Sequence, residues 1–131
     1  MITIDQYFGK FDKTDELIKN AAILLSHVNP LLVEAGMNGI KLPVNPSNKT
    51  QLSGYSFGGF RPSFCPIGAP DSAHKQAMAV DVYDPNNDLD NWLTDQKLEE
   101  YNLYREAPES THKWCHLTTR APGSGHRTFS P

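Results

Sequence analysis

The chain has 131 residues, a formal net charge of −3 at pH 7 and 38% hydrophobic residues. This length predicts a single domain, residues 1–131, and this composition argues against intrinsic disorder. The charge lacks the basic excess of nucleic-acid-binding proteins, and no apolar run approaches the roughly 20 residues that cross a bilayer. We therefore expect a protein that neither binds nucleic acid nor inserts into a membrane, and we take it to be a monomer.

The N-terminus, Met1 to Asp5, lacks the basic region and apolar stretch of a secretory signal peptide. We therefore expect synthesis in the cytoplasm. Cys65 and Cys115 are expected to be buried thiols, because disulfides are rare in cytoplasmic proteins.

A long helix is predicted near the N-terminus. Thr14 is a suitable N-cap, Asp15 and Glu16 put acid in the first turn, and apolar residues follow at helical spacing. Gly36 is the expected end of this helix. Pro30 is expected to kink or split it, because proline lacks the N–H that an interior helical residue donates.

A strand is predicted at residues 50–55, followed by a Gly/Pro-rich loop at residues 56–71. A loop of this length in a compact domain is typically functional, and we expect it to border the site. A second helix is predicted at residues 89–101. The α+β fold is completed by short strands at residues 78–83, 103–106 and 113–118.

Strand alternation predicts which side chains share a face. The apolar neighbours of Asp81 belong in the core, so Asp81 points to the opposite face. In the last strand Cys115 and Leu117 share the apolar face, and His116 lies opposite. Pairing of these two strands would place Asp81 beside His116. His74 precedes the first strand closely enough for its ring to fold back toward them.

His74, Asp81 and His116 together supply two imidazoles and one carboxylate. With a fourth position left for water, this is the ligand count of a catalytic zinc site. A single histidine is more often structural, but three such residues predicted on one face favour a metal. Two other classes of function stay open. One is a non-catalytic zinc domain that binds peptide, glycan or protein, and the other is a metal-free structural protein of a phage particle.

The residues around these ligands resemble the motifs of the M15 D-Ala-D-Ala carboxypeptidase family. Its SxHxxGxAxD signature is similar to Ser72-x-His74-x-x-Ala77-x-Ala79-x-Asp81, and its second motif is similar to Trp114-x-His116. The SGYR stretch that precedes the signature resembles Ser53-Gly54-Tyr55, and residues 117–129 resemble the ending of phage and prophage members. The resemblance covers about residues 50–129.

The resemblance implies a small antiparallel sheet that carries a zinc ion and packs against an N-terminal helix, as in the related hedgehog signalling domains. It implies a zinc peptidase, with His74, Asp81 and His116 as ligands. The implied substrates are peptidoglycan stem peptides containing D-amino acids, which a zinc-activated water would hydrolyse. Ser72 is implied to hydrogen-bond substrate, although a serine there also suits a turn cap. The phage-type ending implies a phage-encoded protein that acts on the cell wall after release, and both a DD-carboxypeptidase and an endopeptidase of the endolysin type stay open.

Three positions depart from the family pattern. Ala77 stands in place of the usual Gly, a mild change if its φ is negative. Ser56 stands where the Arg of SGYR is expected, and Arg61 is the nearest substitute, with a planar fork that suits a substrate carboxylate. Lys113 occupies the place of a Glu that often lies three residues before the last ligand.

The general base therefore has to be chosen from other residues. Glu106 is the first choice, because alternation turns it toward the zinc side if Leu103 faces the core. Glu109 and His112 are the weaker candidates.

Overall fold

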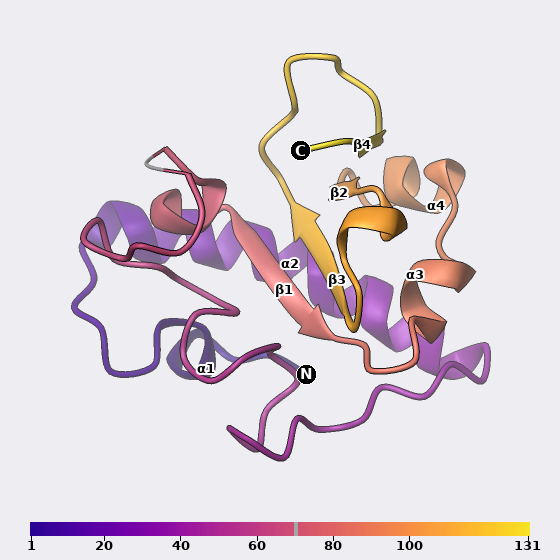
Figure 1. The fold of residues 1–131 in the computed structure, drawn as a ribbon, viewed down its shortest axis with the longest axis horizontal. Coiled ribbons are helices and arrows are strands. Elements are labelled where there is room, and N and C mark those ends of the chain that lie inside the picture. Colours follow the sequence, from indigo (N-terminus) through magenta and orange to yellow (C-terminus); the bar gives the residue numbers. More distant parts are fainter. Residues whose placement is uncertain (70) are drawn as a thin grey trace.

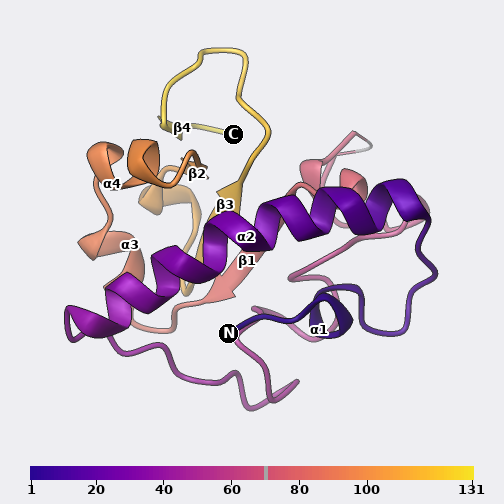
Figure 2. The ribbon, with the colours of Figure 1, turned by 180° about the vertical axis from the view of Figure 1, so that it is seen from behind.

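The fold is α+β, as the sequence predicts, in a computed structural model that describes residues 1–69 and 71–131. The elements in chain order are α1 (Ile4–Phe8), α2 (Asp15–Met37), the 3₁₀ helix η1 (Ala73–Gln76), β1 (Ala79–Tyr83), α3 (Asp88–Trp92), α4 (Asp95–Glu100), β2 (Tyr104–Glu106), the 3₁₀ helix η2 (Pro108–Ser110), β3 (Trp114–Thr118) and β4 (Thr128–Phe129). The helix α2 crosses one face of the sheet (Figures 1 and 2). Among the described residues, no helix has both the length and the apolar character needed to span a membrane.

The sheet has the strand order β1-β3-β2-β4. β3 pairs antiparallel with β1 and with β2, as expected, whereas β4 runs parallel to β2. The chain after β3 makes a wide excursion, yellow in Figure 1, before it returns to the edge of β2. The sequence did not predict β4, because two residues are too few to show an alternating pattern.

α2 begins and ends close to its predicted limits. The Thr14 side chain accepts a hydrogen bond from the backbone N–H of Leu17 at 3.2 Å, which confirms the N-cap. The last helical residue is Met37, one position beyond Gly36. The turn that follows has Gly39 at φ +82°, a backbone conformation that favours glycine.

The expectation that Pro30 splits this helix is wrong, because α2 continues through it. Pro30 is exposed, and so is Ser26, whose carbonyl would otherwise accept the missing N–H bond. Water can therefore satisfy that carbonyl. Val28 and Leu31, both fully buried, hold the helix against the core on either side of the proline.

The core lies between α2 and the near face of the sheet. It contains the fully buried Leu24, Val28 and Leu31 of α2 together with Val80 of β1 and Leu117 of β3. The opposite face of β1 and β3 consequently carries the residues that alternate with these, which include Asp81 and His116.

The helix predicted at residues 89–101 is two helices, α3 and α4. Leu93 is extended, with ψ 141°, and Thr94 caps α4 by accepting a hydrogen bond from the backbone N–H of Lys97 at 3.2 Å. The prediction followed the apolar spacing and overlooked this threonine, which is a signal for a new N-terminus.

The strand predicted at residues 50–55 is wrong, because this segment makes only isolated bridges, Asn45 to Thr50 and Leu52 to Val82. The side-chain amide of Asn45 donates to the carbonyls of Leu52 at 3.0 Å and Gly54 at 2.8 Å. These backbone carbonyls therefore accept hydrogen bonds from a side-chain amide and not from the N–H groups of a neighbouring strand.

Candidate metal centre

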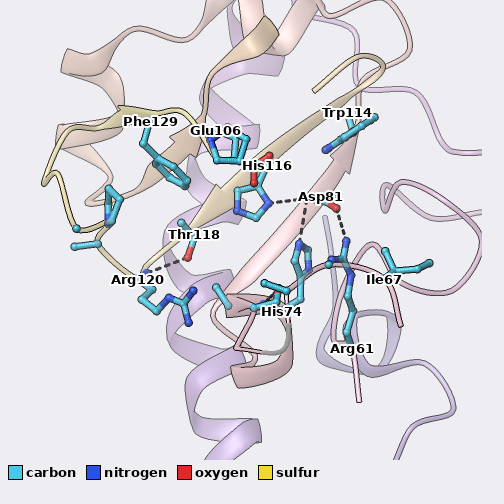
Figure 3. Close-up of a pocket in the computed structure, with 18 residues that line it drawn as sticks. Arg61, Ile67, His74, Asp81, Glu106, Trp114, His116, Thr118, Arg120 and Phe129 are labelled. Atoms are coloured by element: carbon cyan, nitrogen blue, oxygen red, sulfur yellow. Dashed lines mark hydrogen bonds and ion pairs between the residues drawn. The ribbon is translucent and has the colours of Figure 1, made fainter. Parts of the chain in front are cut away.

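Asp81 and His116 lie directly opposite each other in the antiparallel β1–β3 pair. Asp81 Oδ1 is 2.8 Å from His116 Nδ1, and both side chains are on the face away from α2 (Figure 3). The pairing expected from strand alternation is therefore confirmed. A slip of one residue would turn the apolar neighbours of Asp81 out of the core, so the same burial that forms the core also fixes this pair.

His74 reaches the pair from η1, just before β1. Its Nε2 is 3.2 Å from Asp81 Oδ1, and its ring is 2% exposed. On the other side of the ring, Nδ1 is 2.8 Å from the carbonyl oxygen of Gly59, to which it donates a hydrogen bond. A Cβ at Gly59 would collide with the carbonyl of Tyr7 in α1, so only glycine allows this close approach. The bond sets the tautomer of His74 and leaves Nε2 as the ligand atom.

The three side chains meet tightly enough to hold one metal ion. His74, Asp81 and His116 are all buried, and each offers a ligand atom within 4.8 Å of the others. Ligand atoms about 2.0–2.1 Å from a tetrahedral zinc lie roughly 3.3 Å apart. The two contacts of Asp81 Oδ1, at 2.8 and 3.2 Å, are close to that spacing.

The contact between His74 and Asp81 needs a positive charge. Because Nδ1 donates to Gly59, a neutral His74 ring presents a lone pair to the carboxylate of Asp81. Two acceptors at this distance repel each other unless a proton on Nε2 or a bound cation lies between them. The geometry therefore fits a cation site.

The electrostatics of the group favour an ionised carboxylate. Burial opposes ionisation of Asp81, but the charges of and hydrogen bonds from His74 and His116 outweigh it and hold the pKa of Asp81 well below its usual range. Burial alone would lower the pKa of His116, whereas the hydrogen bond and charge of Asp81, with Glu106 further away, raise it. Asp81 and His116 thus each stabilise the charged form of the other.

Arg61 binds the second oxygen of the Asp81 carboxylate. Its Nη2 donates to Asp81 Oδ2 at 3.0 Å, and its Nε donates to the carbonyl of Phe57 at 2.9 Å. Arg61 thus holds the orientation of Asp81, and its contact with substrate stays a prediction. Position 68 favours glycine, because its φ is +82° and a Cβ there would lie 2.7 Å from Arg61 Nη1.

Glu106 lies on the same face of the sheet as the three buried residues. In the β2–β3 register, Tyr104 is opposite Thr118 and Arg105 is opposite Leu117, so one further step brings Glu106 opposite His116. Figure 3 shows Glu106 beside His116 at the wall of the cavity. The two weaker candidates, Glu109 and His112, are exposed and do not line this cavity.

A cavity of about 560 Å³ surrounds the group. Its lining includes Arg61, Ile67, Gly68 and Ala69, so the loop at residues 56–71 borders the site as expected. Pro70, which belongs to that loop, lies outside the described residues.

Ser72 also lines the cavity, and its hydroxyl accepts a hydrogen bond from the backbone N–H of His74 at 3.3 Å. The serine therefore caps η1, and a contact with substrate stays a prediction. Lys113 is exposed and does not line the cavity.

Ala77 does not meet the condition for a mild replacement of glycine. Its φ is +57° and its ψ is +35°, the left-handed region, and its side chain is fully buried. Alanine in the left-handed region costs about 1–2 kcal/mol. Ala77 therefore stands at a backbone position that favours glycine, the residue that the M15 signature has there.

Arg120 and Phe129 are two of the cavity-lining residues that were not among the predicted site residues. Arg120 lies in the bend that follows β3. Its place at the cavity depends on that bend, which no alternating pattern predicts. Phe129 of β4 lies edge-on to His116, with ring centroids 6.3 Å apart. No local pattern predicted β4, so the sequence carried no signal for this contact.

Comparison of the chain with protein-family models, with curated proteins and with solved structures finds no match in any of the three. The likeness to the M15 family consequently rests on the motifs of the sequence and stays a prediction.

Proposed function

We propose that this protein is a zinc-dependent peptidase that hydrolyses peptide bonds in the stem peptides of peptidoglycan. The observation that carries the proposal is a row of three side chains across adjacent strands. Asp81 of β1, His116 of β3 and Glu106 of β2 lie on one face, with His74 beside them and a cavity above them. A structural carboxylate–histidine cluster would not require a further acid at a cavity wall.

Zinc suits the donor set better than Mg²⁺ or Ca²⁺, and the motif resemblance favours it over other transition metals. Two imidazoles and one carboxylate are ligands that Zn²⁺ accepts, whereas Mg²⁺ and Ca²⁺ prefer oxygen ligands alone. His74, Asp81 and His116 would hold the ion. When bound, zinc supplies a Lewis acid that polarises a carbonyl and acidifies water.

Glu106 is the group that would move the proton. As a carboxylate it accepts a proton from the attacking water, and it then gives this proton to the nitrogen that leaves when the peptide bond breaks. The products are a carboxylic acid and an amine. Arg61 would keep the Asp81 carboxylate in place during this step, through its bond to Oδ2.

The substrate class follows from the motif resemblance together with the shape of the site. The group lies at the junction of two cavities, because Arg61, Ile67, Asp81 and Trp114 line both the 560 Å³ cavity and a second one of about 410 Å³. A cleft that extends to both sides of the reacting group suits a peptide better than a small molecule.

Digestion of purified peptidoglycan by the zinc-loaded protein tests the proposal, with the released fragments identified by mass spectrometry. We expect new stem-peptide fragments that are absent when zinc is withheld and absent with Glu106→Gln. The fragment masses will show which bond is cut. A zinc-loaded wild-type protein that releases nothing would contradict the peptidase and favour a non-catalytic zinc domain of the same fold.

A further inference from the structure

Arg120 and Arg61 both line the cavity, but they differ in whether a carboxylate pairs with the guanidinium. Arg61 is paired with the carboxylate of Asp81. Arg120 donates only to neutral acceptors, from Nη1 to the backbone carbonyl of Asp71 at 2.8 Å and to Gln76 Oε1 at 3.0 Å. Among residues 1–69 and 71–131, its Nε and Nη2 have no acceptor, and no carboxylate pairs with it. Its guanidinium therefore keeps donors and a full charge for a ligand.

The backbone holds Arg120 at the cavity. His116 and Thr118 alternate on one face of β3, Arg120 follows them in the bend after this strand, and all three line the cavity. The Thr118 hydroxyl accepts a hydrogen bond from the backbone N–H of Arg120 at 3.0 Å and donates one to the carbonyl of Met78 at 2.7 Å. The two bonds to Nη1 fix the far end of the side chain. Arg120 is thus positioned in advance, which reduces the entropy lost on binding.

The two sides of the metal group have different chemistry. Figure 3 shows the group between Arg120 on one side and Trp114 on the other. Beyond Trp114, the second cavity is lined by Tyr55, Phe57 and Ile67, together with small polar residues and Arg61. Because the charge of Arg61 is paired with the carboxylate of Asp81, a peptide bound across the group would meet an arginine without a carboxylate partner on the Arg120 side only.

We propose that Arg120 binds a carboxylate of the substrate and so fixes the direction in which the peptide lies across the cleft. This inference rests on the proposed function, because it names the part of the peptide that the site recognises. At about 3.3 Å per residue, the two residues from His116 to Thr118 at the end of β3 span roughly 7 Å, and Arg120 follows in the bend just beyond. The carboxylate would lie within one or two residues of the bond that is cut.

Stem peptides offer two sources of such a carboxylate, the chain terminus and the D-glutamyl residue. The test uses two peptides with one carboxylate each. Diacetyl-L-lysyl-D-alanyl-D-alanine carries it at the chain terminus, and an acetylated, amidated L-alanyl-D-glutamyl-L-lysine carries it on the D-glutamyl residue. Each peptide is compared with a version in which that carboxylate is an amide. Dissociation constants are measured by calorimetry with zinc-loaded Glu106→Gln, so that the peptides stay intact. We expect at least one of the two acids to bind about tenfold or more tightly than its amide. The peptide that shows this preference identifies which carboxylate Arg120 binds.

In the same background, Arg120→Gln should bind that acid and its amide equally, and Arg120→Lys should give an intermediate preference, because it keeps the charge but loses the planar fork. Arg127→Gln is the matched control. Arg127 lies over the ring of Tyr104, 4.4 Å from its centroid, and does not line the cavity, so its removal should leave the preference unchanged.

An Arg120→Gln protein that still prefers the acid would overturn the inference, as would a parent protein that prefers neither acid. If peptidoglycan is digested but no preference depends on Arg120, only this inference fails. If an Arg120-dependent preference is measured but peptidoglycan is not digested, the carboxylate site stands and the peptidase fails.

Discussion

Asp81 and His116 face each other across the β1–β3 pair, with 2.8 Å between Oδ1 and Nδ1, while their neighbours Val80 and Leu117 form a matching pair in the core. The alternation that buries one pair presents the other to the cavity. The geometry of the candidate metal centre is therefore coupled to the packing of α2 on the sheet, and only His74 depends on a loop for its position.

Glu106→Gln should retain the fold and bound zinc but lose on the order of 10²-fold or more in the rate of peptide hydrolysis, because an amide cannot accept the proton from water. Glu109→Gln is the matched control, since Glu109 is exposed and outside the cavity. Steady-state kinetics with the best stem peptide and metal analysis of each variant make the comparison. Near-normal turnover by Glu106→Gln would show that Glu106 is not the base.

Arg61→Ala should reduce kcat/KM about 10–100-fold, the usual effect of removing a group that orients a metal ligand. The loss has two sources in this structure, the freed Oδ2 of Asp81 and the missing bond to the carbonyl of Phe57. Kinetics beside the control Arg127→Ala will measure it. An unchanged kcat/KM would exclude both the orienting role and the predicted contact with substrate.

Ala77→Gly should change the free energy of unfolding by less than about 1 kcal/mol. Relief of the left-handed alanine favours glycine by about 1–2 kcal/mol. Loss of one buried methyl, about 0.8 kcal/mol, and the greater entropy of glycine in the unfolded chain, about 0.4–1 kcal/mol, act the other way. Denaturant unfolding measures the sum, with Ala77→Val as the comparison that should destabilise. A change above 2 kcal/mol for glycine would mean that one of these effects has been misjudged.

Zinc affinity should rise with pH and then level off, because both imidazoles must lose their protons before they bind metal. Asp81 stays ionised throughout, since its pKa is held well below the usual range. Hydrogen bonding to Asp81 raises the pKa of His116 above the ordinary value of 6.5, so the fall in affinity should begin at a higher pH than for an unperturbed histidine. Below that point we expect up to about tenfold loss per pH unit for each imidazole. Competition with a chelator of known affinity gives the profile, and an affinity that does not vary between about pH 5.5 and 7.5 would contradict it.

Because the pKa of His116 is raised, the metal-free protein becomes less stable as the pH rises, whereas zinc binding becomes stronger. A folded-state pKa above the unfolded value means that protonated His116 stabilises the metal-free fold at low pH. That contribution is complete below the unfolded pKa and is lost as the pH rises through the folded one. Metal-free protein should therefore lose stability over the pH range in which its zinc affinity increases.

Local patterns predicted the parts of this molecule that burial determines. The N-cap at Thr14 follows from its residue type beside acid in the first turn. The strands β1, β2 and β3 and the facing of Asp81 and His116 follow from the spacing of apolar residues in short windows of sequence. The Glu106 face followed in the same way, because alternation along β2 needs no knowledge of distant partners.

The parts that could not be predicted depend on the path of the chain between those windows. The carbonyl of Gly59 behind His74 and the bond from Arg61 to Asp81 both come from a loop that has no repeating pattern. The positive φ of Ala77 arises because η1 must end and β1 must begin within two residues of it. The parallel partner β4 is too short to produce a local signal.

The most direct measurement is the zinc content and affinity of the wild-type protein beside His116→Ala and the control His126→Ala, whose histidine is exposed and outside the site. Metal analysis after dialysis, with titration against a competing chelator, should give one tightly bound zinc per chain for wild type and His126→Ala. His116→Ala should lose most of the metal while circular dichroism shows a retained fold. Full zinc retention by His116→Ala, or no stoichiometric zinc in the wild-type protein, would contradict the metal centre on which the peptidase depends.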